Sequence, residues 1–215
     1  YPYQDAIDAA GIPLLSLASW NDSGYARSAI NRFLTTRSAL QRVIITPGNH
    51  GLGHYYAPGV TAPIRSRFDL KAELLAFFDY YVAGIDNGYA DEPRVRWFTT
   101  GAEQWRAAAQ WPQGGGALSF CLTPDNGLAR RGCGRTRDVI HVPRADAATG
   151  GLTRWNTTMG MPVAYPEHSR QDAALLHFTS APFSTATEVT GSPVVTLAIA
   201  NSAPPIGRMA VCTAS

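Results

Sequence analysis

Two residues able to carry out proton transfer, Asp22 and His50, each follow a short apolar run of the sequence. Asp22 comes after residues 12–20, and His50 comes shortly after residues 43–46. A carboxylate that accepts a hydrogen bond from an imidazole fixes the tautomer of the ring and stabilises the imidazolium that forms during proton transfer. Together, Asp22 and His50 could therefore act as an acid–base pair in nucleophilic catalysis.

The elements around these residues are expected to bring them together. Residues 26–40 carry apolar side chains at helical spacing, with arginines turned outward. Two runs too short for isolated helices, one on each side of a helix, indicate a strand–helix–strand unit in a parallel sheet. Functional side chains gather at the carboxyl ends of such strands, so we expect Asp22 and His50 to lie close together there. Two plainer interpretations stay open, with Asp22 as a helix cap and His50 as an exposed turn residue.

The rest of the chain divides into a helical part and a strand-rich part. Residues 1–10 read as the end of a helix that stops at Gly11, and residues 68–82 read as a helix whose apolar face lies on a sheet. A polar stretch at residues 86–93 is the best domain boundary. Strand-like runs separated by Gly- and Pro-rich turns follow it, at residues 95–99, 117–122, 175–179 and 194–199. The fold class is therefore α/β plus all-β, with one domain at residues 1–90 and a second at 91–215.

Five segments, in order along most of the chain, resemble the X-Pro dipeptidyl-peptidase (S15) and cocaine esterase-like (CocE/NonD) hydrolases. Residues 13–22 are similar to that family's P-x-L-x-x-x-G-W-x-D segment, and residues 45–51 to its I-G-P-W-x-H-G segment. The other three are residues 77–84 (FFD-x-x-L-x-G), 97–112 (a Trp-Arg pair and a Trp-Pro pair) and 181–194 (V-x-G-x-P). The resemblance implies that Asp22 is the acid of a Ser-His-Asp triad and His50 its general base.

The sequence departs from the family pattern at two positions close to these residues. Ser19 stands where the family usually has glycine, and Gly48 stands where it has tryptophan. The first change is expected to matter little. The second removes a bulky aromatic side chain beside the base and puts the shape of the substrate pocket in doubt.

The nucleophile that the resemblance implies is not in this chain. The family uses a serine in G-x-S-x-G, on a strand-to-helix turn that precedes the acid, and no such motif occurs here. The two serines that precede Asp22, Ser16 and Ser19, lie inside the expected strand, so neither can form that turn. We therefore expect a C-terminal portion of a serine hydrolase that is inactive alone, because nucleophile and oxyanion hole supply most of the rate.

The resemblance also implies the architecture and the substrate class. We expect the last part of an α/β-hydrolase sheet followed by an incomplete jelly-roll β-sandwich. Because missing strands expose edges and apolar faces, aggregation, dependence on a partner or a homo-oligomer is expected. The missing N-terminal half with the serine would be one partner. Substrates would be small esters, X-Pro peptides or acylated β-lactams.

Three aromatic or imidazole side chains near the pair are candidates for substrate binding, namely Trp20, His54 and Tyr55. A Tyr-rich surface loop is an equally good interpretation of the last two. A different class of function also stays open, in which a non-catalytic β-sandwich binds carbohydrate or a protein partner through Trp105, Trp111 and Trp155.

The composition argues against several other classes of function. The net charge is only +2 and charged residues make up 16% of the chain, so nothing indicates binding to nucleic acid or to an anionic membrane. No apolar run reaches the length of a membrane span, and no signal peptide is visible, so the location stays unknown. No metal site or cofactor is predicted, because no second Cys or His stands at zinc-like spacing. A disulfide between Cys121 and Cys133 stays open, and would indicate export.

Overall fold

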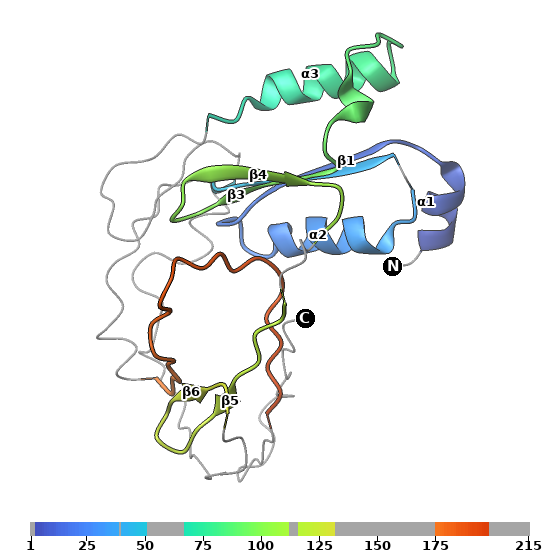
Figure 1. The fold of residues 1–215 in the computed structure, drawn as a ribbon. Coiled ribbons are helices and arrows are strands. Elements are labelled where there is room, and N and C mark those ends of the chain that lie inside the picture. Colours follow the sequence, from blue (N-terminus) through green and yellow to red (C-terminus); the bar gives the residue numbers. More distant parts are fainter. Residues whose placement is uncertain (1–2, 39, 51–66, 112–115, 132–174, 198–215) are drawn as a thin grey trace.

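The structure, a computed structural model, describes residues 3–38, 40–50, 67–111, 116–131 and 175–197. Its centre is a four-stranded sheet with strand order β1-β2-β3-β4 (Figure 1). Strand β1 (Leu14–Ser19), helix α2 (Tyr25–Thr35) and strand β2 (Gln41–Thr46) form the strand–helix–strand unit, and the two strands are parallel with Ser19 opposite Thr46. The prediction of this unit is confirmed.

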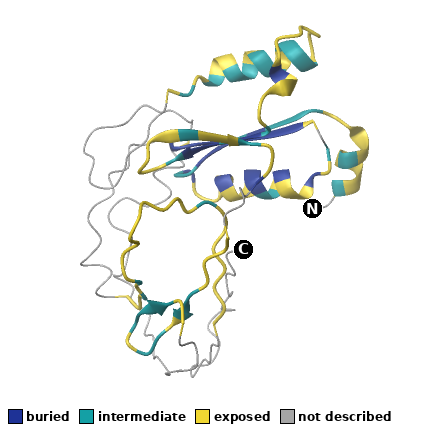
Figure 2. Ribbon diagram, viewed as in Figure 1, coloured by how far each residue is buried: buried dark blue, intermediate teal, exposed yellow. Residues whose placement is uncertain are grey.

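Helix α2 covers one face of the sheet and makes the core with it. The helix has an apolar stripe at the spacing that its turns require, and this stripe is its buried face (Figure 2). Strand β2 is buried along its whole length, because strands flank it on both sides. The core cluster joins side chains of the helix, of the three parallel strands and of the segment after the sheet: Ala18, Ala26, Ala29, Ile30, Phe33, Val43, Ile45, Val95, Trp97 and Trp111.

The third and fourth strands lie after the domain boundary suggested by the sequence, at residues 86–93, but they belong to the sheet formed by β1 and β2. Strand β3 (Val95–Thr99) pairs in parallel with β2, and β4 (Gln104–Ala108) pairs antiparallel with β3. We expected residues 95–99 in the second domain, whereas they extend the sheet that carries Asp22 and His50. An alternating run such as this one fits a half-buried strand in either sheet, so the run itself does not specify its neighbour.

Two expected helices are present, and one of them packs differently from the prediction. Helix α1 (Gln4–Ala10) ends at Gly11, which has the left-handed φ of 61° that favours glycine. Helix α3 (Leu70–Tyr81) begins at Asp69, whose side chain accepts a hydrogen bond from the backbone N–H of Ala72 at 3.0 Å. None of the residues of α3 is buried. Its apolar side chains at 70, 74, 77 and 81 are half-buried, and those of Phe77 and Tyr81 line a cavity with the first residues of β1 and β2. The expectation that an apolar face of α3 is laid on the sheet is therefore met only in part.

Helix α3 is held to the sheet by a cluster of charged and aromatic side chains, which we call the Glu73 cluster. It comprises Arg42 of β2, Glu73 of α3, Tyr89 of the short 3-10 helix η1 (Tyr89–Asp91) and Arg96 of β3. The Glu73 carboxylate accepts hydrogen bonds from the Tyr89 hydroxyl (2.8 Å) and from Arg96 Nη1 (3.0 Å). The Arg42 guanidinium lies over the Tyr89 ring, 3.8 Å from its centroid.

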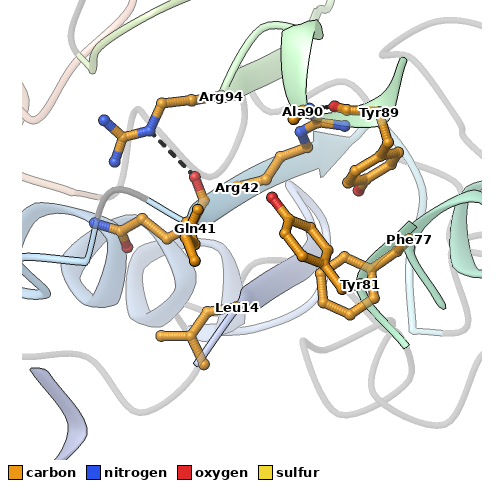
Figure 3. A pocket seen from close by; sticks show the side chains of 9 residues that line it. Leu14, Gln41, Arg42, Phe77, Tyr81, Tyr89, Ala90 and Arg94 are labelled. Atoms are coloured by element: carbon orange, nitrogen blue, oxygen red, sulfur yellow. Dashed lines mark hydrogen bonds between the residues drawn. The ribbon is translucent and has the colours of Figure 1, made fainter. Parts of the chain in front are cut away.

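A small cavity adjoins this cluster at the end of the sheet where β1 and β2 begin. Leu14 and Gln41, the first residues of those strands, line it together with Phe77, Tyr81 and Tyr89. Figure 3 shows the Gln41 side chain turned away from the three aromatic rings, where its amide donates to the carbonyls of Phe33 and Thr36. Asp22 and His50 follow the opposite ends of the same two strands. The cavity is therefore not part of the site discussed below.

Tyr89 is expected to make stability depend on alkaline pH. Burial, followed by the hydrogen bond to Glu73, raises the pKa of Tyr89 well above its usual value. The neutral hydroxyl therefore stabilises the folded state below about pH 10, where tyrosine of the unfolded chain begins to ionise, and this contribution is lost as the pH rises further. Urea unfolding between pH 8 and 11 should show a steeper fall in the free energy of unfolding for the wild type than for Tyr89→Phe. Equal slopes would contradict this role.

The described part of the strand-rich region contains two short strands, β5 (Cys121–Leu122) and β6 (Leu128–Ala129), which pair antiparallel. Thr179 adds a parallel bridge to Gly127. Residues 194–197, expected as part of a strand, are described and are not in one. The jelly roll therefore stays a prediction. Cys121 forms a disulfide, and both other cysteines lie outside the described residues, so the pairing with Cys133 also stays a prediction.

Glu188 ties the segment of residues 175–197 to the sheet. Its carboxylate accepts hydrogen bonds from Trp97 Nε1 (3.3 Å), Thr99 Oγ1 (3.1 Å) and Arg106 Nε (3.2 Å), toward the turn that joins β3 to β4. Burial acts to raise the pKa of Glu188, but these hydrogen bonds, one from Thr190 and the charge of Arg106 lower it overall. The carboxylate is therefore held in its charged form where the segment of residues 175–197 contacts β3 and β4.

Candidate active site

The ends of β1 and β2 bring the two loops of interest side by side. The ladder between the strands continues past its last register pair, because the backbone N–H of Trp20 donates to the carbonyl of Thr46 (2.9 Å). The backbone N–H of Asn21 then donates to the carbonyl of Gly48 (3.2 Å). The residues that follow on the two loops, Asp22 and His50, are thereby placed at one edge of the sheet.

Asp22 and His50 are in direct contact. The Nδ1 atom of His50 lies 3.1 Å from each carboxylate oxygen of Asp22. Since a carboxylate only accepts hydrogen bonds, this contact assigns the proton of the neutral ring to Nδ1 and leaves the lone pair on Nε2. A ring in that tautomer can take a proton at Nε2, as a general base does.

The Asp22 side chain is buried and the His50 side chain is exposed, as an acid–base pair in catalysis requires. The Asp22 side chain is 8% exposed and the His50 side chain is 52% exposed. A buried carboxylate is shielded from water and acts strongly on a cation that forms beside it, while an exposed imidazole is accessible to a reactant. The arrangement can move a proton between solvent-accessible Nε2 and a bound molecule.

The turn after β1 aims the Asp22 carboxylate at His50 instead of at the helix. The N-cap of α2 is Gly24, without any side-chain cap hydrogen bond, so the interpretation of Asp22 as a helix cap is wrong. The backbone of Asp22 makes the turn by donating to Ser19 and accepting from Tyr25. Ser23 adopts a left-handed φ of 53°, which is uncommon for a residue other than glycine.

The two serines that precede Asp22 lie within β1, as predicted. Ser19 is fully buried, and its hydroxyl is 2.8 Å from the hydroxyl of Thr46 on the neighbouring strand. Ser16 is also buried. This Ser19–Thr46 pair lies directly beneath the loops of Asp22 and His50, where the family pattern has glycine at the first position.

Tyr25, which the sequence analysis did not single out, lies beside the imidazole. Its ring centroid is 6.0 Å from that of His50, with the rings tilted by 48°, and the residue is exposed. Its position at the start of α2, three residues after Asp22, is the only sequence signal for it. Tyr25 offers an aromatic surface next to the base.

The predicted substrate-binding residues are only partly described. The indole N–H of Trp20 donates to the carbonyl of Phe98 (2.7 Å), and its ring packs 6.1 Å from that of Trp111. His54 and Tyr55 lie outside the described residues. The substrate-binding roles therefore stay predictions.

Two of the three tryptophans that supported a binding module, Trp105 and Trp111, pack against other aromatic rings. Trp111 is buried against Trp97 at 5.6 Å between ring centroids, and Trp105 is half-buried against Phe98. Trp155 lies outside the described residues. Within the described part of the chain, no three His, Cys, Asp or Glu side chains gather as metal ligands, and no helix has the length and apolarity needed to cross a bilayer.

Comparison with known proteins places these features in a family. Residues 87–211 match the X-Pro dipeptidyl-peptidase C-terminal non-catalytic domain. Proteins of Mycobacterium bovis and Mycobacterium tuberculosis that are named as serine esterases are each 37% identical over 206 residues, which is 93% of this chain and 32% of theirs. The cocaine esterase of a Rhodococcus species is 24% identical over 212 residues, or 89% of this chain and 36% of its own.

Two solved structures are also similar to part of this chain. A CocE/NonD family hydrolase from Staphylococcus aureus is 17% identical with a TM-score of 0.43, over 58% of this chain and 22% of its own. An aminopeptidase from a marine sediment archaeon is 21% identical with a TM-score of 0.41, over 56% of this chain and 21% of its own. The chain spans about a third of the length of the curated relatives it matches, 32–36%. The chain belongs to the X-Pro dipeptidyl-peptidase and cocaine esterase-like hydrolase family and carries the C-terminal portion of that family's fold.

Proposed function

We propose that this chain supplies the acid and the general base of a serine hydrolase that cleaves ester or amide bonds by acyl transfer. The observation that carries the proposal is the contact of His50 Nδ1 with both carboxylate oxygens of Asp22 at 3.1 Å. The nucleophilic serine would come from a segment with a G-x-S-x-G turn, which the 215 residues do not contain.

In the proposed reaction, His50 takes and returns the proton, and Asp22 stabilises the charged ring. The serine hydroxyl attacks the carbonyl carbon of the substrate while His50 Nε2 takes the hydroxyl proton. The imidazolium, stabilised by the Asp22 carboxylate, then gives this proton to the leaving alcohol or amine as the bond to the carbonyl breaks. Water attacks the acyl-enzyme in the same way, with His50 again as base, and releases the acid and the free serine.

We favour esters over X-Pro peptides as substrates. The relatives at 37% identity are named as serine esterases, and a further relative as a cocaine esterase. The exposed ring of Tyr25 beside His50 suits an aromatic or apolar group of the substrate. Cleavage of X-Pro amides in preference to esters is the alternative outcome.

The experiment that tests the proposal reconstitutes the hydrolase. The chain is co-expressed with an upstream segment that carries G-x-S-x-G, and hydrolysis of a p-nitrophenyl ester and of an X-Pro anilide is measured. Asp22→Asn should lower kcat by about 10⁴-fold, because the amide no longer holds the required tautomer. The matched control is Asp5→Asn, which removes an exposed Asp–Arg37 pair (3.6 Å) and should leave kcat unchanged. If Asp22→Asn retains full activity in a folded, active complex, the assignment fails.

A further inference from the structure

The side chain of Asn21 joins the loop of Asp22 to the loop of His50. Its Nδ2 atom donates a hydrogen bond to the carbonyl of Pro47 (2.9 Å), and its backbone N–H donates to the carbonyl of Gly48 (3.2 Å). Asn21 directly precedes Asp22, and Pro47 and Gly48 precede His50 by three and two residues. One residue therefore connects the two loops by two hydrogen bonds at the point where the sheet ends.

The chemistry of this connection requires an amide of this length. Pro47 has no backbone N–H, so its carbonyl is its one backbone group that can take part in a hydrogen bond. The side-chain amide of Asn21 supplies a donor to the Pro47 carbonyl. Aspartate at position 21 has the same size but no N–H to donate, and alanine has neither donor nor reach.

The contact that depends on this connection has little tolerance for movement. Each distance between His50 Nδ1 and an Asp22 oxygen is 3.1 Å, close to the upper end of the usual range for an N–H···O hydrogen bond. A small displacement of the exposed His50 side chain away from the buried Asp22 carboxylate would break the contact.

We propose that Asn21 is a positioning residue, which holds the loop of His50 in register with that of Asp22 and so keeps the imidazole in the tautomer with its lone pair on Nε2. The inference rests on the proposed function, because it gives Asn21 its role through the acid and the base. It adds a requirement that the family's W-x-D pattern leaves unspecified at this position.

The test reads the tautomer directly by NMR of the ¹⁵N-labelled chain. At alkaline pH the chemical shifts of the two ring nitrogens distinguish a proton on Nδ1 from a proton on Nε2. The wild type should show His50 protonated on Nδ1. In Asn21→Ala the Nδ1–H form should be lost in favour of the Nε2–H form that a free imidazole prefers. Asn21→Asp keeps the size of the side chain, and it decides the question if the alanine variant does not fold.

The chain offers a closely matched control. Asn87, in the segment after α3, donates from Nδ2 to the carbonyl of Ala76 within the helix at 2.9 Å, the same type of bond at the same length. Asn87→Ala should leave the His50 spectrum unchanged. A folded Asn21 variant with the wild-type tautomer overturns the proposal for Asn21. If Asp22→Asn also leaves the tautomer unchanged, the acid–base pair itself is wrong, so the two failures are distinguishable.

A kinetic measurement separates positioning from general stability. In the reconstituted hydrolase, Asn21→Asp should lower kcat by roughly 10- to 100-fold, as expected for a base displaced by about an ångström, with KM unchanged. A rise in KM alone, or an equal loss in Asn87→Asp, would contradict a positioning role.

Discussion

Replacement of His50 by alanine is expected to lower kcat of the reconstituted hydrolase by on the order of 10⁶-fold. The reason is that the serine then has no base to take its proton, while the Asp22 carboxylate is left without the cation that it would stabilise. The substrate would still bind, so KM should change little. The measurement is the steady-state rate on a p-nitrophenyl ester, with circular dichroism to confirm the fold.

A second histidine provides the control for this experiment. His177 is exposed, and its Nδ1 lies 3.3 Å from the carbonyl of Leu175 in place of a carboxylate. His177→Ala should retain wild-type kcat, since proton transfer in the proposed site does not use it. Activity that survives in folded His50→Ala would show that another group acts as the base.

The second large effect is expected on stability, from Glu73→Ala. The Glu73 side chain is mostly buried, and it accepts hydrogen bonds from Tyr89 and Arg96 with Arg42 nearby at 3.8 Å. Its removal leaves the buried Arg42 guanidinium without that compensating charge, and such losses cost about 3 kcal/mol. Because α3 has no buried residue of its own, the helix should loosen first.

Urea unfolding and hydrogen exchange test this prediction together. The free energy of unfolding should fall, and the amides of α3 should lose protection well before those of β2. Glu103→Ala removes an exposed glutamate from the turn between β3 and β4, together with its hydrogen bond from the backbone N–H of Gly101 (3.1 Å), and should lower the free energy of unfolding by about 1 kcal/mol at most. A Glu73→Ala variant as stable as Glu103→Ala would show that other contacts hold the helix.

The strand–helix–strand unit was predictable because its signals are local. Apolar runs and helical spacing define the elements, and a parallel pair of strands sends both ends to one edge of the sheet. The contact of Asp22 with His50 follows from that topology without knowledge of any other part of the chain. The helix-cap interpretation of Asp22 failed because the turn at Ser23 moves the cap position to Gly24.

The position of α3 could not be predicted from its own sequence. Its apolar stripe indicates contact with a sheet face. In the structure the sheet presents two arginines, Arg42 and Arg96, toward the helix. The Glu73 carboxylate therefore faces the sheet, while the apolar side chain of Phe78 is 52% exposed. The arginines of β2 and β3 determine which face of α3 turns to the sheet. The spacing of apolar residues within the helix gives no information about those arginines.

The supporting residues of the site were missed for a related reason. Asn21 is a single polar residue between a tryptophan and an aspartate, and Tyr25 is one aromatic residue at the start of a helix. Asn21 matters because it contacts the Pro47 carbonyl of the neighbouring loop, and Tyr25 because it contacts the His50 ring. Spacing within one segment identifies residues with chemical capability, whereas residues that hold them in place are recognised only by contact.

The most direct test of the account is the rate at which a fluorophosphonate labels the serine of the reconstituted hydrolase. This reagent reacts with a serine only when a neighbouring base removes its proton, so the rate reports on activation without any dependence on the choice of substrate. We predict fast labelling of the wild type, much slower labelling of Asp22→Asn, and almost none of His50→Ala. Labelling of folded His50→Ala at the wild-type rate would contradict the assignment of His50 as the general base.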